Sequence, residues 1–366
     1  MKNKRIVLTT GGSGGHIFPA QAAAEALLAL NMDVIFITDK RGKEFQGLDK
    51  VKTYRLSAES VTGRSFFGKI RAAFLLLYGA IQALFLLKKL RPDMVIGFGS
   101  YASIPVGIAA EMLKIPVLLH EQNAVLGRAN RVLAKGARLI LTSFQKTYLI
   151  PASVPTKWTG LPVRPTVLSV ANAPYPPEKG YHLLVFGGSQ GATFFSKGVA
   201  DAIAALPENI LKKLHLVQQV RPEDLKRLKD FYAALPFASV TLKSFFDDMP
   251  QQLVEAHLVI GRAGASTISE ALTVGRPLIL IPLPTSADDH QKMNALQCTD
   301  MNGWVTDERS FSVPEFSGLL KNILSDAELR QKKAKLALKG QTLTAAETIA
   351  ETVADVLNCP GKKKKH

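Results

Sequence analysis

Short apolar runs alternate with helical stretches along this chain, and the alternation limits it to few folds. The runs include "KRIVLTT", "DVIFIT", "DMVIGFGS", "IPVLLHEQN" and "ARLILTS". Apolar, β-branched runs of this length are typical of buried strands, and the alanine-rich "AQAAAEALLAL" after the first run has helical spacing. Strands that alternate with helices form a parallel sheet with helices on both faces.

The same order begins again in the second half of the chain. A strand, a glycine turn and a helix follow one another in "GYHLLVFGGSQGATFFSKGVADAIAAL", and "HLVIGRAGASTISEALTVG" and "RPLILIPLP" continue the pattern. We therefore predict an α/β chain of two doubly wound, Rossmann-like domains that face a cleft. Their expected bounds are 1–163 and 164–345, followed by a helix and basic tail in 346–366. The sequence leaves open whether that helix packs back on the first domain.

The first domain is strongly basic. Residues 1–163 contain 22 basic and 9 acidic residues, and the formal net charge of the whole chain is +16. Such a charge is typical of a protein that meets a polyanion, namely nucleic acid, anionic lipid or phosphate, although solubility alone explains it equally well. The two cysteines stand in no motif, so neither a disulfide framework nor a metal cluster is indicated.

The glycine loop "GGSGGH" follows the first predicted strand. Its glycines let a ligand approach the backbone, and the start of the helix behind them favours phosphate. The loop fits neither G-x-G-x-x-G nor the GK[ST] ending of a P-loop, which disfavours a nicotinamide enzyme or a P-loop NTPase. His16 closes the loop. A lone histidine is more often structural, but at a helix start its ring stays neutral and can act as a general base.

A second group of polar residues follows "GRAGASTISE" in the other half of the chain. Glu270 stands one turn into a predicted helix, where a carboxylate can accept both ribose hydroxyls, although a helix-capping role explains Glu270 better when it is taken alone. Asp288 and Asp289 precede a histidine, but adjacent residues point apart and no third and fourth metal ligands are evident. We therefore predict no metal and no cofactor, and expect Gln291 to bind a polyhydroxylated ligand.

Six segments of the chain resemble those of a known family. "GGSGGHIFPA", "HEQNAVLGRANR", "GGSQGA", "FFDDM", "GRAGASTISE" and "DDHQKMNA" occur in the order and at the spacing of the MurG family. The resemblance covers essentially the whole chain. It implies a GT-B glycosyltransferase of peptidoglycan synthesis, which moves N-acetylglucosamine (GlcNAc) from UDP-GlcNAc to lipid I and so forms lipid II.

The resemblance also implies partners and a location. UDP-GlcNAc, lipid I and an anionic membrane surface are the expected partners, and nucleic acid is not. The protein is expected to be peripheral, on the cytoplasmic face of the bacterial inner membrane. Whether other cell-wall synthesis proteins bind it stays open.

Site residues are carried over from the family by position. His16 is the implied general base, with Glu121 or a water molecule as the alternative. By this resemblance, the first glycine loop approaches the donor sugar and phosphates, and Asn123 and Gln291 contact the sugar. Arg164 and Ser189 lie near phosphate. Phe246 and the segment 265–270 surround uridine, with Glu270 on the ribose. The implied substrate-binding set is Ser13, Gly14, Gly15, Asn123, Arg164, Ser189, Phe246, Ala265, Ser266, Thr267, Ile268, Ser269, Glu270 and Gln291. Two positions depart from the family pattern. This chain has Phe246 where the family usually has a branched aliphatic residue, and Ser100 where the family usually has glycine.

Two other functions stay open. A nucleotide-sugar 2-epimerase shares the GT-B fold and the donor, but it needs no lipid-facing basic domain. A nucleic-acid-binding protein would explain the basic charge, but the chain has no recognised nucleic-acid module. Release of UDP that depends on the acceptor separates the proposed transferase from both.

The stretch 64–91 is the candidate membrane contact. Its uncharged part is too short and too polar for a transmembrane helix, yet more apolar than an ordinary surface helix. Helical spacing predicts that one set of residues faces the sheet: Ile70, Phe74, Leu77, Ile81 and Leu84. It leaves another set without an obvious core partner: Phe66, Phe67, Leu75 and Phe85. Basic residues flank the stretch, so we expect it to dock on anionic lipid; a wholly buried helix is the alternative.

Overall fold

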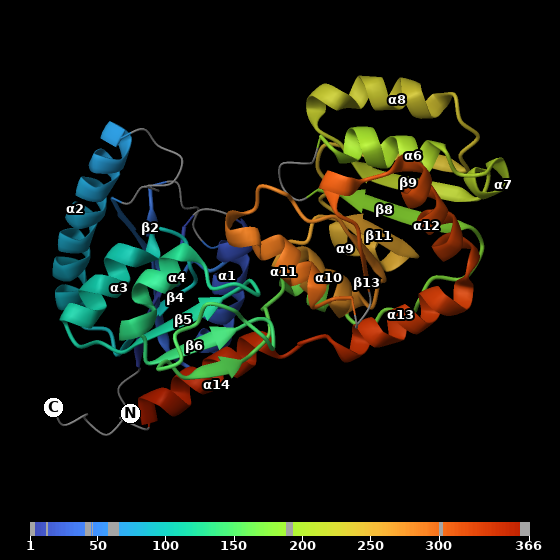
Figure 1. Cartoon of the computed structure of the whole chain (residues 1–366). Helices are drawn as coiled ribbons and strands as arrows, with labels where there is room; N and C mark the ends of the chain where they lie inside the picture. The colour runs from blue at the N-terminus through green and yellow to red at the C-terminus, as the bar shows by residue number, and fades with distance from the viewer. Residues whose placement is uncertain are drawn as a thin grey trace. The chain divides into compact units, whose positions relative to one another are not determined.

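The computed structural model describes residues 4–11, 14–40, 45, 47–57, 66–187, 193–299 and 303–358, with no side chains for 66–73. The chain forms two compact units (Figure 1). The first contains Met1–Arg164 together with Thr344–His366, and the second contains Pro165–Leu343. Each unit is a parallel sheet with helices on its faces, so the predicted fold class of two doubly wound domains is confirmed.

Seven parallel strands form the sheet of the first unit, in the order β3-β2-β1-β4-β5-β6-β7. Their bounds are β1 (Arg5–Thr9), β2 (Asp33–Asp39), β3 (Lys52–Leu56), β4 (Met94–Gly97), β5 (Val117–Glu121), β6 (Leu139–Thr142) and β7 (Thr156–Trp158). β1 pairs with β2 on one side and with β4 on the other. The strand order therefore reverses between β1 and β4, and ligand sites form at the carboxyl ends of strands at such a reversal.

Helices cover both faces of this sheet. Their bounds are α1 (Gly14–Ala29), α2 (Phe66–Leu90), α3 (Ser103–Met112), α4 (Arg128–Leu133) and α14 (Ala345–Asn358). α1 and α14 share the core of one face, whereas α2, α3 and α4 cover the other. Ile349, Ala350 and Val353 of α14 are buried in the first core. The helix at the end of the chain thus packs back on the first unit, a point that the sequence left open.

α2 turns a different face to the core from the one that its spacing predicts. Gly79, Ala83 and Leu87 are buried, and a Cβ on Gly79 would lie 2.1 Å from the carbonyl oxygen of Ser57. The prediction that three large residues face the sheet is wrong, because Phe74, Leu77 and Ile81 are 66%, 60% and 46% exposed. The helix is apolar on more than one side, and its small residues allow the closest approach to the neighbouring backbone.

The other residues predicted on α2 have mixed outcomes. Phe85 is 67% exposed, as predicted, and Leu84 packs against the core, also as predicted. Leu75 is half-buried rather than exposed. The side chains of Phe66, Phe67 and Ile70 lie outside the described part of the chain.

Six parallel strands form the sheet of the second unit, in the order β10-β9-β8-β11-β12-β13. Their bounds are β8 (Tyr181–Phe186), β9 (Leu214–Gln219), β10 (Ser239–Lys243), β11 (Leu258–Gly261), β12 (Leu278–Leu280) and β13 (Gly303–Val305). The helices are α5 (Pro165–Leu168), α6 (Ala200–Ala204), α7 (Glu208–Leu211), α8 (Leu225–Ala233), α9 (Met249–Glu255), α10 (Ala265–Val274), α11 (His290–Leu296), α12 (Val313–Ser325) and α13 (Ala327–Lys339). The strand order again reverses, here between β8 and β11, so this unit repeats the layout of the first.

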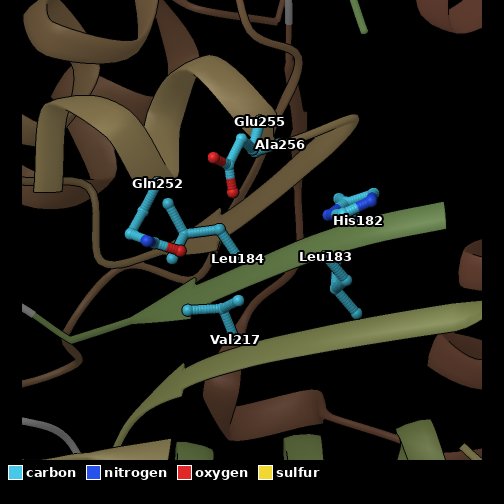
Figure 2. A pocket seen from close by; sticks show the side chains of 7 residues that line it. All are labelled: His182, Leu183, Leu184, Val217, Gln252, Glu255 and Ala256. Atoms are coloured by element: carbon cyan, nitrogen blue, oxygen red, sulfur yellow. The ribbon is translucent and has the colours of Figure 1, made fainter. Parts of the chain in front are cut away.

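Histidines gather at the amino-terminal edge of the second sheet. His182 of β8 stacks on His215 of β9, with their ring centroids 4.5 Å apart. His182 also lines a small cavity together with Gln252 and Glu255 (Figure 2). The cavity volume is about 10 Å³, enough for one water molecule. It is therefore not a site for a larger ligand.

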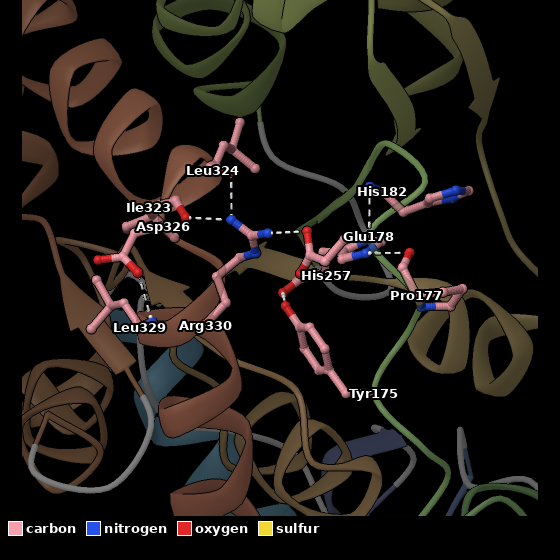
Figure 3. Close-up of polar contacts among 10 residues, drawn as sticks. All are labelled: Tyr175, Pro177, Glu178, His182, His257, Ile323, Leu324, Asp326, Leu329 and Arg330. Atoms are coloured by element: carbon pink, nitrogen blue, oxygen red, sulfur yellow. Dashed lines mark hydrogen bonds and ion pairs between the residues drawn. The ribbon is translucent and has the colours of Figure 1, made fainter.

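His257 lies beside this cavity in a network of buried polar groups (Figure 3). Its Nδ1 accepts a hydrogen bond from the backbone N–H of His182 at 3.1 Å, and its Nε2 donates to the carbonyl of Pro177 at 3.2 Å. Burial, together with the nearby charge of Arg330, which pairs with Glu178, lowers the pKa of His257 to about 4, although the bond to Pro177 opposes the shift. The folded protein thus holds His257 neutral.

We expect acid to destabilise the second unit through His257. Its pKa falls from an ordinary 6.5 in the unfolded chain to about 4 in the fold, so the unfolded state binds a proton first as the pH decreases. The contribution of His257 to the free energy of unfolding is complete above pH 6.5 and decreases between 6.5 and about 4. Urea denaturation near neutral pH and at about pH 5 measures this loss.

His257→Asn should reduce the loss of stability at acid pH, since the amide oxygen still accepts the His182 N–H but does not titrate. His290→Asn, at the start of α11 in the same unit, is the matched control and should leave the acid loss unchanged. Equal acid sensitivity in the wild-type protein and the His257→Asn variant would contradict this account.

Candidate functional site

The first group of candidate residues lies at the carboxyl edge of the first sheet, where the strand order reverses. α1 begins at Gly14, so the last three residues of the GGSGGH segment form its first turn rather than a loop, and Ser13 lies outside the described residues. No described atom lies within 4 Å of the position of a Cβ on Gly15, so a ligand can approach its backbone. Ser100, where the family usually has glycine, adopts φ +66°, the left-handed region that favours glycine.

His16 lies in the first turn of α1 and faces the loop after β4. Its Nδ1 is 2.9 Å from the carbonyl oxygen of Phe98 and 3.0 Å from Oε1 of Gln122. Both oxygens are acceptors, so Nδ1 carries the proton of the neutral ring and Nε2 carries the basic lone pair. Gly99 (φ +77°) passes against the ring, where an added Cβ would lie 3.2 Å from it.

Glu121 holds the loop that follows β5. Its buried carboxylate accepts the backbone N–H of Asn123 at 3.0 Å and the side-chain amide of Asn123 at 3.3 Å. It also accepts the backbone N–H of Gly127 and the side-chain amide of Asn130, both at 2.8 Å. These four donors occupy the carboxylate, so Glu121 does not suit the alternative role of general base. It positions Asn123 instead.

Arg164 brings positive charge to the same unit. Its guanidinium carbon lies 5.4 Å from the centroid of the Phe18 ring, a cation–π contact. Phe18 lies on α1, two residues after His16. The contact therefore holds the Arg164 guanidinium beside α1.

The second group of candidate residues begins α10, directly after β11. Gly264 is extended (ψ 142°) and no side-chain cap bonds to this helix start. The first-turn N–H groups, which belong to Ala265, Ser266 and Thr267, thus face away from the helix and suit an anion. Ile268 is buried, and the carbonyl of Ser269 accepts a hydrogen bond within the helix from Thr273 at 2.8 Å.

The remaining predicted residues of this unit are largely inward-facing. Glu270 is buried one turn into α10, and Ser189 lies outside the described residues. Phe246 is only 4% exposed, so its backbone, rather than its ring, is left for a ligand. Oε1 of Gln291 accepts the backbone N–H of Leu283 at 2.9 Å, which fixes the orientation of the side-chain amide.

Two buried polar residues brace this edge. Arg262 donates to the carbonyls of Ile281 and Pro282 at 3.1 and 3.3 Å and pairs with Glu308. Asn294 donates to the carbonyl of Ala263 at 3.0 Å. Within the described residues, no group of three histidine, cysteine or acidic side chains could hold a metal ion.

Gln122 contacts His16, and His120 contacts Gln122 in turn, but neither residue was expected from the sequence to have a role. The available signal was their spacing, because alternate residues at the end of a strand point to the same side. Both residues stand in "HEQN" on either side of Glu121.

Comparison with known proteins identifies close relatives. The N-terminal domain of glycosyltransferase family 28 matches residues 6–142, and its C-terminal domain matches residues 182–358. A protein of Paramagnetospirillum magneticum is 42% identical over 96% of this chain and 96% of its own length. It is named UDP-N-acetylglucosamine--N-acetylmuramyl-(pentapeptide) pyrophosphoryl-undecaprenol N-acetylglucosamine transferase. A protein of Rhodospirillum centenum with the same name is 43% identical over 95% of this chain and 93% of its own.

Solved structures with the same fold include two of interest. The crystal structure of Acinetobacter baumannii MurG has a TM-score of 0.79 and 28% identity, over 96% of this chain and 99% of that one. The UDP-GlcNAc 2-epimerase of Neisseria meningitidis has a TM-score of 0.69 over 96% of this chain and 100% of that one. Its identity of 14% indicates a shared fold alone.

Glu121→Gln should loosen the first unit. The glutamine amide has one acceptor oxygen in place of two, so its NH₂ group would face two of the four N–H donors that now bind Glu121. Because those donors would be left without an acceptor, we expect the free energy of unfolding to fall by about 1–3 kcal/mol. Glu111→Gln, an exposed position on α3, should change it by less than about 0.5 kcal/mol. Thermal or urea denaturation measures both, and equal stability of the two variants would contradict the positioning role of Glu121.

Proposed function

The chain belongs to glycosyltransferase family 28, and we propose that it transfers N-acetylglucosamine from UDP-GlcNAc to N-acetylmuramyl-(pentapeptide) pyrophosphoryl-undecaprenol, which is lipid I. The observation that carries this function is the 42% identity with a transferase of that name across 96% of both chains. The GT-B fold and the resemblance to the MurG family, both expected from the sequence, are confirmed. Only a shared fold supports the epimerase alternative.

The proposed reaction inverts the configuration at the anomeric carbon. The acceptor hydroxyl oxygen bonds to that carbon while the bond from the carbon to the phosphate oxygen of UDP breaks. Nε2 of His16 takes the hydroxyl proton, since its Nδ1 already carries one. The leaving UDP keeps the bonding electrons, and the N–H groups that begin α10, with Arg164 and Ser189, offset its charge.

The proposed donor site extends over further residues. The backbone of Gly14 and Gly15 approaches the phosphates and sugar, and Asn123 and Gln291 bind sugar hydroxyls. Phe246 and the segment 265–270 hold uridine, with the Glu270 carboxylate on the ribose. The open backbone at Gly15 and the uncapped start of α10 support this assignment.

UDP release from UDP-GlcNAc tests the proposed function. Release should depend on a lipid I analogue, because the acceptor hydroxyl is the nucleophile. If UDP appears equally fast without acceptor, or if the donor is converted to its 2-epimer, the transferase assignment fails.

His16→Ala should lower kcat by about 10²–10⁴-fold, which is the usual contribution of a general base. The variant should bind UDP as the wild-type protein does, because His16 acts on the acceptor hydroxyl. Single-turnover kinetics and UDP titration measure the two effects. A near-normal kcat would reduce His16 to a residue that shapes the loop.

We also propose that the first unit docks on the cytoplasmic face of the inner membrane through the outer face of α2. No helix of the described part is long and apolar enough to cross a membrane. The outer face of α2 nevertheless exposes five large apolar side chains, Phe74, Leu77, Tyr78, Ile81 and Phe85. Lys88 and Lys89 follow at the exposed end of the helix, and together such groups suit an anionic lipid surface. An acceptor with an undecaprenyl chain is held in that surface.

Vesicle sedimentation tests the docking. Binding should rise with anionic lipid and fall with salt, because each nearby lysine contributes about 1 kcal/mol through charge. Phe74→Ser with Phe85→Ser should weaken binding and leave UDP affinity unchanged. Leu30→Ser, at an exposed apolar position after α1, is the control and should bind normally. No vesicle binding at low salt would overturn the proposal.

A further inference from the structure

We propose that Gln122 and His120 are positioning residues that fix the ring tautomer of His16. The inference rests on the proposed role of His16 as general base. Neither residue is proposed to touch the substrate. Both affect the reaction only through the His16 ring, because they determine which of its two nitrogens carries the lone pair.

Gln122 stands between the two histidines. Its Oε1 lies 3.0 Å from Nδ1 of His16, and its Nε2 donates to the carbonyl of Phe98 at 3.0 Å. The same Nε2 lies 3.3 Å from Nδ1 of His120. A side-chain amide has one acceptor end and one donor end. With the donor end on Phe98 and His120, the acceptor end must face His16.

His120 fixes the orientation of that amide. Its ring is fully buried, and its Nε2 lies 3.3 Å from the carbonyl oxygen of Gly160, which can only accept. Nε2 therefore carries the proton, and Nδ1 accepts from Gln122. Burial lowers the pKa of His120 to about 4; the bond to Gly160 opposes this effect and the nearby His16 adds to it. The ring thus stays neutral, with its acceptor nitrogen toward Gln122.

The hydrogen bonds consequently run in one direction, from His16 through Gln122 and His120 to Gly160. Turning the amide of Gln122 over would place its oxygen against the Phe98 carbonyl oxygen, where two acceptors would repel. The opposite tautomer of His16 would also place a lone pair against two acceptor oxygens, those of Phe98 and Gln122. Both alternatives are penalised, and Nε2 of His16 is left as the basic nitrogen.

Other ionisable groups belong to the surroundings of His16. Asp39 ends the neighbouring strand β2, and Glu121 lies between the two proposed positioning residues in sequence, with its carboxylate engaged by the loop that follows β5. Arg164 contacts α1 through Phe18. None of these groups is altered in the variants below, so any change in the His16 ring comes from residue 122.

Nitrogen-15 NMR of the imidazole rings tests the inference on the full chain, with signals assigned by their loss in His16→Gln and His120→Phe. In the wild-type protein, we expect His16 as the Nδ1–H tautomer, and His120 as the Nε2–H tautomer without titration between about pH 5 and 8. Gln122→Met removes one of the two acceptors that face Nδ1 of His16, so it should raise the share of the Nε2–H tautomer, although the Phe98 carbonyl still favours Nδ1–H. Gln122→Glu should keep Nδ1–H and make His16 titrate at higher pH, because a carboxylate then faces it.

Gln218→Met is the matched control. Gln218 is a buried glutamine of the second unit, where it donates to the carbonyl of Phe195 at 3.1 Å and accepts the Tyr232 hydroxyl at 2.8 Å. Its loss should leave the His16 and His120 signals unchanged. An Nε2–H His16 in the wild-type protein, an Nδ1–H His120, or a His16 ring that responds to neither Gln122 variant would overturn the inference.

Kinetics separates this inference from the proposed base. Gln122→Met should lower kcat only as far as it lowers the Nδ1–H share of the His16 ring, about two- to fivefold, well below the roughly 10²–10⁴-fold that loss of a general base costs, with little change in KM for the donor. Gln122→Glu should move the acid limb of the kcat profile to higher pH. If the tautomer changes while kcat does not, the positioning stands and the assignment of His16 as base fails.

Discussion

Parallel pairing is the constraint on which the rest of the structure depends. All the strands of each sheet end at the same edge, and the pairing of β1 with β4 aligns Thr9 with Gly97. The helix that follows β1 therefore begins beside the loop that follows β4, and His16 meets the Phe98 carbonyl. In the second sheet, Gly261 pairs with Phe186, so the start of α10 lies at the same edge as the carboxyl end of β8. Both groups of candidate residues follow from these registers.

Loops at such an edge lack the backbone pairing of the strands, and buried polar side chains replace it. Glu121 holds the loop after β5, Arg262 holds the loop after β12, and Asn294 holds the segment between β11 and α10. In the sequence these residues look like catalysts, because acids, arginines and amides also carry chemistry. Their contacts show that most of their hydrogen-bonding capacity goes to the protein itself. Their main effect is thus to hold the backbone of these loops in place.

The uniformly apolar strands and the two glycine turns were predictable from the sequence, because a strand buried on both faces is apolar throughout. β3, β7 and β10 were not, since these edge strands are mostly polar and exposed or partly buried: β7 is exposed throughout, β10 alternates exposed with partly buried residues, and β3 has a buried side chain only at Leu56. On α2, the spacing of apolar residues did not decide which side of the helix is buried. The side that contains Gly79 is buried, because a residue without a side chain lets the helix lie against the backbone at Ser57. Likewise, the position of His16 was predictable, but its contact with Gln122 depends on the register of β4 and β5.

The return of α14 to the first unit has a consequence for synthesis. A ribosome releases the strands of the first sheet early, but Ile349, Ala350 and Val353 emerge only after the whole of the second unit. The apolar face of α1 that they cover stays open to water until then. The second unit can complete its core from a continuous stretch of chain, whereas the first must wait. The order of translation thus favours completion of the core of the second unit before that of the first. Until α14 emerges, the incomplete core of the first unit is the apolar surface that a chaperone can bind.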